Sequence, residues 1–375
     1  MKITIVTNIP TPYQNSFFGQ LAARPDVDLH VVYAGMTEPN RDWVWSADDF
    51  DYSYEMPWRV PLSGRMGIKH TNPGILLSRP VWTADAVIIG GWSFPTVLAA
   101  ALMRVATRRA WFYWIENFAY DPAASFRSHR AKRWLLNQAS GVLPIDSRCE
   151  ANVLSAGVRP EAIERFPYVT DSAEIASQTA ALRARDPSGD SNVLNVLFVG
   201  QLTERKGLAF AIDALGQVAS EGHAVVLTVI GSGPQEQSLR ERAARHPELS
   251  VRFEGFAQPD QLPHYYAAAD VALVPSLYDG WALVVNEGLA AGLPVVATTA
   301  VGASDVIEDG VSGYVVEPGD VDALSVVLRR FAEDRAHLNQ MKRDAANLGA
   351  SLDASHQAEK LLGFVRRRLN APHAG

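Results

Sequence analysis

The sequence contains little that would support a secreted, disulfide-bonded or membrane-spanning protein. Only one cysteine, Cys149, occurs in 375 residues, which excludes an intrachain disulfide and any site built from several cysteines. No uninterrupted apolar run approaches the ~18 residues that a membrane span requires. The apolar start at residues 3–7 is too short for a signal peptide and precedes two prolines, so we interpret it as a buried strand. These absences favour a cytoplasmic protein.

Positive charge in excess is also missing. The net charge of the chain is −7. Residues 1–170 hold 17 Lys+Arg against 15 Asp+Glu, a net charge of +2, and the remainder holds 17 against 26, a net charge of −9. This acidic second half argues against general nucleic-acid binding. The nine histidines show no metal-ligand spacing, and we expect no metal and no cofactor. The basic helix at 127–138 predicts a solvated face, with binding of an anionic lipid-linked acceptor as the sharper alternative. A further alternative, peripheral contact with the inner membrane face, comes from the basic end of the last helix, 354–369.

What is present is a long alternation of apolar strands and helices, typical of α/β folds with doubly wound parallel sheets. A polar, turn-rich run at 186–192 divides it. The pattern predicts an N-terminal Rossmann-like domain over 1–170, a linker over 171–192 and a C-terminal Rossmann-like domain over 193–353. The apolar stripe of helix 354–369 predicts that it docks back on the first domain.

One segment of the second domain brackets a helix with two carboxylates, Asp279 and Glu287. Eight helical steps separate them by up to ~12 Å along the axis. With the helix-start N–H groups available to a phosphate, this spacing suits a nucleotide-diphosphate sugar. The alternative is that Asp279 is only an N-terminal cap and Glu287 a solvated helix residue.

Several further segments resemble the retaining glycosyltransferases of the large GT-B-fold group often called family 4 (group 1 glycosyl transferases). The resemblance spans about 120 residues in the family's order, and the first half matches more loosely. The segments are Val199-Gly-Gln-Leu-Thr-Glu-Arg-Lys-Gly207, Val229-Ile-Gly-Ser-Gly-Pro234, Phe253-Glu-Gly-Phe256, Ala269-Asp-Val-Ala-Leu-Val-Pro-Ser276, the 279–287 segment and Val301–Val316. The family implies two Rossmann-like domains that face each other across a cleft.

The resemblance also assigns roles. Asp279 takes the first acidic position of the family's E-x7-E motif, which contacts the transferred sugar, and Glu287 the second, which holds the ribose. Arg205 and Lys206 resemble the basic pair that neutralises the diphosphate, so no metal is required. The remaining donor-binding residues implied are Gly231, Ser232, Gly233, Phe256, Gly280, Trp281, Ala282 and Leu283.

The first domain departs from the family. Where a glycine-rich loop often follows the first strand, this chain has Pro10-Thr-Pro-Tyr13, which suggests an acceptor-side role for Pro12 and Tyr13. Gly91 and Trp92 are assigned to the same side. Glu116 ends a strand that is expected to face the cleft, as a base or acceptor-binding residue.

The sequence therefore predicts a metal-independent hexosyltransferase-type enzyme. It would move a sugar from a nucleotide-diphosphate donor to a glycan, lipid-linked or small-molecule acceptor, with the choice of UDP or GDP left open. A nucleotide-sugar epimerase of GT-B architecture and a non-catalytic sugar-nucleotide sensor are the alternatives. Nucleic acid is not an expected partner.

Overall fold

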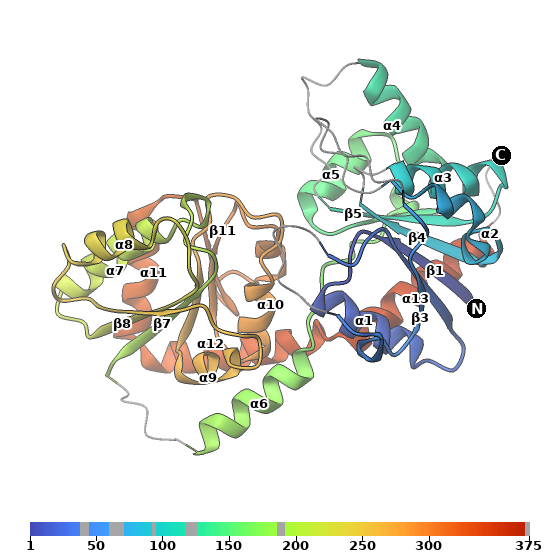
Figure 1. Ribbon diagram of the computed structural model, residues 1–375. Helices are drawn as coiled ribbons and strands as arrows, with labels where there is room; N and C mark the ends of the chain where they lie inside the picture. Colours follow the sequence, from blue (N-terminus) through green and yellow to red (C-terminus); the bar gives the residue numbers. More distant parts are fainter. Residues whose placement is uncertain (38–44, 60–70, 92–94, 117–125, 186–191, 372–375) are drawn as a thin grey trace. The chain divides into compact units, whose positions relative to one another are not determined.

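The computed structural model describes residues 1–37, 45–59, 71–91, 95–116, 126–185 and 192–371, and the chain divides into two compact units (Figure 1). Unit 1 comprises Met1–Val169 with Ala354–Gly375, and unit 2 comprises Thr170–Asp353. Helix α13 (Ala354–Asn370) thus returns to unit 1, where it packs against α1 (Pro12–Ala22).

Unit 1 contains a six-stranded parallel sheet in the order β3-β2-β1-β4-β5-β6. Its strands are β1 (Lys2–Thr7), β2 (Asp28–Tyr33), β3 (Ser53–Glu55), β4 (Ala86–Gly90), β5 (Trp111–Ile115) and β6 (Gly141–Pro144). The other helices are α2 (Arg79–Thr83), α3 (Pro95–Ala106), α4 (Phe126–Gln138) and α5 (Ser147–Ser155). Strand β5 is buried along its whole length, as expected for a strand covered on both faces.

Unit 2 repeats this topology in the order β12-β11-β10-β7-β8-β9, again with parallel strands. The strands are β7 (Leu194–Val199), β8 (Val225–Ile230), β9 (Ser250–Gly255), β10 (Val271–Val274), β11 (Val295–Thr298) and β12 (Gly313–Val316). The helices are α6 (Ser172–Arg185), α7 (Leu208–Ser220), α8 (Glu236–Ala243), α9 (Leu262–Ala268), α10 (Leu283–Ala290), α11 (Val321–Glu333) and α12 (Arg335–Ser351).

When the strands of each unit are numbered along the chain, they lie across the sheet in the order 3-2-1-4-5-6, which is the Rossmann order. The α/β, doubly wound prediction is therefore confirmed for each unit. In unit 2 the strand order reverses between β7 and β10, which are paired directly. Ligands of such sheets bind beyond the carboxyl ends of the strands at this switch point. The loops that follow β7 and β10 are thus the first place to look for a site.

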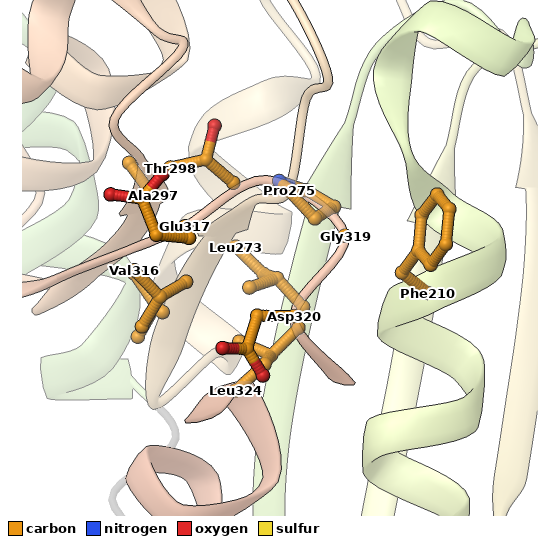
Figure 2. A pocket seen from close by; sticks show the side chains of 11 residues that line it. Phe210, Leu273, Pro275, Ala297, Thr298, Val316, Glu317, Gly319, Asp320 and Leu324 are labelled. Carbon is orange, nitrogen blue, oxygen red and sulfur yellow. The ribbon is translucent and has the colours of Figure 1, made fainter. Parts of the chain in front are cut away.

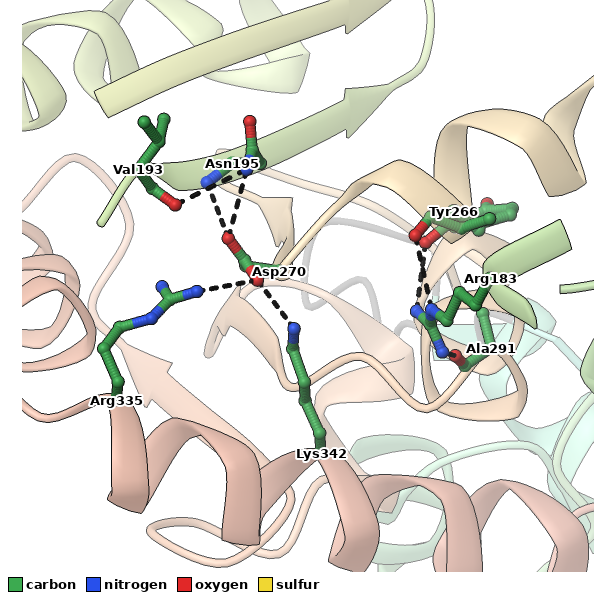
Figure 3. Close-up of polar contacts among 9 residues, drawn as sticks. Arg183, Val193, Asn195, Tyr266, Asp270, Ala291, Arg335 and Lys342 are labelled. Atoms are coloured by element: carbon green, nitrogen blue, oxygen red, sulfur yellow. Dashed lines mark hydrogen bonds and ion pairs between the residues drawn. The ribbon is translucent and has the colours of Figure 1, made fainter. Parts of the chain in front are cut away.

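The structure places a helix in the segment 171–192 that was expected to be a linker. Helix α6 packs against α9, and Arg183 near its end donates hydrogen bonds to three backbone carbonyls, those of Tyr266, Ala267 and Ala291 (Figure 3). Because the Arg183 guanidinium hydrogen-bonds carbonyls at the carboxyl ends of both α9 and α10, it stabilises the packing of α6 against these two helices. Pattern reasoning missed α6 because its exposed face leaves only a weak apolar stripe.

Helix α12 was not predicted either, and a buried charge network holds it to the sheet. Asp270 accepts from the Asn195 backbone N–H at 2.9 Å, from Lys342 Nζ at 2.6 Å and from Arg335 Nη2 at 3.1 Å (Figure 3). Burial acts to raise the pKa of Asp270, but the Lys342 charge and the Asn195 N–H outweigh it, so the pKa is lowered. The network joins β7, β10 and α12.

The apolar pattern predicts a helix over residues 17–23, whereas α1 begins five residues earlier, at Pro12. Thr11 Oγ1 accepts the Gln14 N–H as an N-cap, and Pro12 occupies the first helical position, where its fixed φ is favourable. Pro12 and Tyr13 therefore belong to the first turn of a helix rather than to a loop. The segment 36–74 is rich in Trp, Pro and Asp, which predicts long loops, yet its described part contains strand β3. Helix α5 was not predicted.

Candidate functional site

An ion-pair cluster joins the loops that follow β7 and β10. Lys206 Nζ lies 2.5 Å from Asp279 Oδ2, and Arg205 Nη1 lies 3.5 Å from the same oxygen. The side chains of Lys206 and Asp279 are 15% and 13% exposed, whereas that of Arg205 is 44% exposed. Three residues that the sequence analysis assigned to the donor site are thus brought together. Asp279 carries one negative charge against two positive charges, so the cluster keeps a net affinity for an anion.

Main-chain hydrogen bonds fix this cluster. The Arg205 carbonyl accepts from the N–H groups of Leu277 and Tyr278, and Arg205 Nη1 donates to the Tyr278 carbonyl at 2.8 Å. Asp279 is held from the other side, because its N–H donates to the Ala300 carbonyl at 3.1 Å. The N-cap of the following helix is Ala282, three residues further on, so Asp279 is not the N-cap that the alternative reading expected.

Two glycines permit the close packing of these loops. Gly207 has a φ of +68°, and a Cβ placed on it would lie 1.9 Å from the Pro275 carbonyl oxygen. Gly231 has a φ of +133°, and its Cβ would lie 1.9 Å from the Gly200 carbonyl oxygen. Only glycine combines this backbone with so close an approach. The carboxyl ends of β7, β8 and β10 are consequently drawn together.

Helix α10 starts directly beside Asp279. Its N-cap is Ala282, whose φ of +72° and ψ of +85° are unusual for a residue with a Cβ. Such a conformation costs on the order of 1–3 kcal/mol and is concentrated at functional sites. Trp281 is buried, with its indole N–H donating to Asn286 Oδ1 at 2.9 Å and its carbonyl accepting from the Ala303 N–H.

The same helix start supplies donors for an anion. Gly280 and Leu283 are half-buried on either side of the Trp281–Ala282 step. The first N–H groups of a helix have no acceptor within it, and the helix dipole favours negative charge at this end. The diphosphate role proposed for this segment is physically consistent with that geometry.

Glu287 lies one turn into α10 and is not a solvated helix residue. It is half-buried, and the hydroxyl of the fully buried Tyr266 donates to Glu287 Oε2 at 2.6 Å. Burial raises the pKa of Glu287, and the hydrogen bond from Tyr266 acts in the opposite direction. The sequence analysis did not identify Tyr266, because a tyrosine in a short helix is usually interpreted as a residue of the hydrophobic core.

The loops after β8 and β9 hold the other predicted donor residues. The Gly231 N–H donates to the Gly255 carbonyl at 2.7 Å, and the Leu202 N–H donates to the Ser232 carbonyl at 2.9 Å. Gly233 packs against Leu202 as well. Phe256 follows β9 with 68% of its surface exposed. Its ring is available to a planar ligand group at this edge of the sheet.

The first-half candidates occupy the carboxyl edge of the unit 1 sheet. Gly91 follows β4 with a φ of +85°, and its carbonyl accepts from the Tyr113 hydroxyl at 3.0 Å. Tyr13 packs edge-on against Tyr168, with ring centroids 5.1 Å apart. Glu116 follows β5, where desolvation raises the pKa of its carboxyl group although the residue keeps an exposed face. Trp92 lies outside the described residues.

A small hollow opens elsewhere at the carboxyl edge of unit 2, between the starts of α7 and α11 (Figure 2). It is lined mostly by apolar side chains, with Glu317 and Asp320 at its margin, and holds about 10 Å³, room for one water. None of the predicted site residues lines it. Asp320 is occupied as the N-cap of α11, accepting from the Ala323 N–H at 2.9 Å.

Over the ranges that the structure describes, no group of three or more His, Cys, Asp or Glu side chains is placed to hold a metal ion. A search of the same ranges finds no helix with the length and apolarity needed to cross a membrane.

Comparison with known proteins finds a family match over most of unit 2. Residues 184–348 match the family described as glycosyl transferases group 1. The amylovoran biosynthesis glycosyltransferase AmsK of Erwinia amylovora is 35% identical over 150 residues, which is 38% of this chain and 37% of AmsK. The alpha-D-kanosaminyltransferase of Streptomyces kanamyceticus is 26% identical over 253 residues, 66% of this chain and 64% of that protein. The chain thus matches between about a third and two thirds of these relatives' lengths.

The structure of Anabaena HepE in complex with UDP shares the fold, with a TM-score of 0.74 at 19% identity, covering 98% of this chain and 100% of HepE. Residues 184–348 thus resemble a group 1 glycosyl transferase domain, and each unit has the Rossmann-like fold of the GT-B glycosyltransferases. These matches support a GT-B glycosyltransferase and give no support to the epimerase alternative.

Proposed function

We propose that this chain is a retaining glycosyltransferase that moves a sugar from a nucleotide-diphosphate donor to a carbohydrate, lipid-linked or small-molecule acceptor. The observation that carries the proposal is the contact of Lys206 Nζ with Asp279 Oδ2, beside Arg205 and the start of α10. Sugar transfer leaves a nucleoside diphosphate that gains negative charge as the glycosidic bond breaks. Fixed cations and helix-start N–H groups stabilise such a leaving group.

In this proposal Lys206 exchanges partners. Without donor it pairs with Asp279; when a diphosphate enters, the phosphate oxygens compete for the ammonium group. Asp279 is then available to accept hydrogen bonds from hydroxyls of the sugar. Glu287, oriented by Tyr266, accepts from the ribose hydroxyls. The side-chain cations supply the charge that the leaving group needs, so the proposal includes no metal ion.

UDP is the nucleotide to test first. The solved structures of Anabaena HepE hold UDP, UDP with glucose, and UDP-glucose. Phe256, exposed beside the Gly231–Gly255 contact, offers a surface for the base. GDP-linked sugars are the second set to be screened. A ligand that binds the folded state raises its Tm, so thermal shift against nucleotide sugars identifies the donor.

For the acceptor we propose a growing polysaccharide or its lipid-linked precursor, handled in the cytoplasm at the inner membrane face. AmsK and the putative colanic acid glycosyltransferase WcaL of Salmonella typhimurium are named for polysaccharide synthesis. Tyr13, Gly91 and Glu116, which lie at the carboxyl edge of the unit 1 sheet, are the acceptor-side residues in this proposal, with Glu116 as the candidate base.

The site assignment is tested by Lys206→Ala and Glu287→Ala, assayed for sugar transfer once the donor is known. Each substitution should lower kcat/KM by about a hundredfold or more while the Tm stays within a few degrees. Arg343→Ala, which removes an exposed cation of α12, is the matched control. Near-wild-type transfer by both variants would exclude this site.

Two product analyses complete the test. Donor incubated without acceptor should yield no epimer, because an epimerase needs no acceptor. NMR of the transferred product should show the donor's own anomeric configuration. An inverted product would remove the retaining mechanism but leave the glycosyltransferase assignment intact.

A further inference from the structure

A basic pocket lies in unit 1 at the amino-terminal edge of the sheet, opposite the carboxyl edge that holds Gly91 and Glu116. It has a volume of about 290 Å³ and is formed where β5 begins and where α3, α4 and α13 end. Parallel strands place their amino ends at one edge and their carboxyl ends at the other, so this pocket is separate from the proposed acceptor side. Nothing in the proposed transfer reaction uses it.

Five arginines line the pocket, and no aspartate or glutamate does: Arg104, Arg108, Arg109, Arg159 and Arg368. One of these arginines, Arg159, forms an exposed ion pair, with its Nε 3.5 Å from Glu161 Oε1. Glu161 and Asp85, which acts on Arg104, offset at most two of the five positive charges, so an excess of positive charge remains. A concave, basic site of this kind attracts anions from solution.

Arg104 carries its charge into the protein interior. It is 1% exposed, and its guanidinium donates to the backbone carbonyls of Val81, Ala84 and Ala110 at 2.7–3.2 Å. Burial and the neighbouring Arg109 charge lower the pKa of Arg104 to about 10, with Asp85 acting in the opposite direction, so it stays protonated at neutral pH. Apart from Asp85, only carbonyl dipoles offset this buried charge, so Arg104 adds to the positive potential of the pocket.

The turn between α3 and β5 presents two arginines in succession. Arg108 has a φ of +53°, a left-handed backbone that is unfavourable for a residue with a Cβ. Its side chain is exposed and makes no hydrogen bond or ion pair with other residues of the described ranges. Arg109 Nη1 donates one hydrogen bond to the Thr83 carbonyl at 3.2 Å, so the other N–H groups of its guanidinium are available to a ligand.

The walls are fixed by the returning C-terminal helix. Arg368 donates from Nε to the Ser140 carbonyl at 2.7 Å, which ties α13 to the turn before β6. Trp111 forms part of the lining, and its buried indole N–H has no acceptor within the described part of the chain. The pocket is thus rich in donors and poor in acceptors.

We propose that this pocket is a binding site for a phosphate-bearing ligand of about diphosphate size. Guanidinium groups bind phosphate oxygens in pairs, which suits arginine better than lysine for this task. The volume lies at the lower end of the range for small-molecule sites, enough for two phosphate groups and too small for a whole nucleotide sugar. The phosphate belongs either to a free solute or to the headgroup of a lipid.

The test uses the full chain and inorganic pyrophosphate, titrated by calorimetry at low salt. Because the donor site also binds diphosphates, Lys206→Ala removes that contribution and should leave the unit 1 site intact. In this background, Arg108→Ala with Arg109→Ala should weaken pyrophosphate binding by about tenfold or more. Both arginines are exposed, so the fold should persist, and Arg159→Ala gives a second probe. Arg79→Ala, an exposed arginine of α2, is the control.

A second arm distinguishes the source of the phosphate. Cosedimentation with phosphatidylglycerol vesicles is compared with phosphatidylcholine vesicles, for the same variants. Vesicle binding lost in the double variant identifies a lipid headgroup, and soluble binding lost without any vesicle effect identifies a free phosphate. If the double variant binds pyrophosphate and anionic vesicles as the unsubstituted pocket does, the proposal is wrong. That outcome would leave the transferase proposal untouched, since its site lies in unit 2.

Discussion

The Tyr266 hydroxyl donates a 2.6 Å hydrogen bond to Glu287 Oε2, and thereby couples helix α9 to helix α10. The tyrosine is 1% exposed, so its hydroxyl has no water to replace this partner. The bond fixes the carboxylate that is proposed to hold the ribose. Tyr266 acts through Glu287 and is therefore a positioning residue.

Tyr266→Phe should lower kcat/KM for the donor by about tenfold, mainly through a higher KM. Because the hydrogen bond from Tyr266 opposes the burial that raises the pKa of Glu287, its loss should raise that pKa further. The acidic limb of the pH profile of kcat/KM should then move to higher pH. Tyr265→Phe, at the neighbouring half-buried position, is the control. An unchanged pH profile would show that Tyr266 only packs.

Asp279→Asn should separate binding from transfer. Removing the carboxylate frees Lys206 from its 2.5 Å contact, so UDP should bind several-fold tighter as measured by calorimetry. Sugar transfer should nevertheless fall by tenfold or more, because the sugar hydroxyls lose their acceptor. Asp322→Asn, an exposed aspartate of α11, serves as the control. Weaker UDP binding by Asp279→Asn would contradict the partner exchange of Lys206.

Gly231→Ala should destabilise unit 2 far more than Gly222→Ala. Both glycines have positive φ, so each substitution costs about 1 kcal/mol in backbone strain. Only at Gly231 does the new Cβ meet a backbone oxygen, 1.9 Å away, whereas nothing lies within 4 Å of the Cβ at Gly222. Urea denaturation should show at least ~2 kcal/mol between the two variants. Equal effects would mean that the loops after β7 and β8 move apart at little cost.

Asp270→Asn should cost on the order of 3 kcal/mol at pH 7, because Lys342 and Arg335 lose their buried counter-ion. The folded-state pKa of Asp270 is lowered, so its contribution is fully present above the unfolded value of about 3.9. It is lost as the pH falls through the lower folded pKa. The free energies of unfolding of the two proteins, measured by urea denaturation, should therefore begin to converge below about pH 4 and meet only below the folded-state pKa of Asp270. Asp344→Asn, at a half-buried position of α12, should change little at either pH.

The sequence by itself determined the strand and helix alternation. It also predicted a donor segment with Arg205, Lys206, Asp279 and Glu287, and the structure brings the first three of these together. Apolar strands with glycine-rich ends are local patterns, and local patterns can be read along the chain. The start of α1 was placed too late because a threonine cap carries little local signal. Helix α6 was missed because its apolar stripe is weak. The tertiary structure was needed to correct both.

Only the tertiary structure decided which distant residues meet. Lys206 and Asp279 are 73 positions apart, and their contact depends on the parallel pairing of β7 with β10. Tyr266 meets Glu287 because α9 and α10 both pack against α6. The arginine pocket is formed by α3 and the last turn of α13 together. The whole of unit 2 lies between these two helices in the sequence. Such contacts follow from sheet topology and chain return, which no spacing along the sequence encodes.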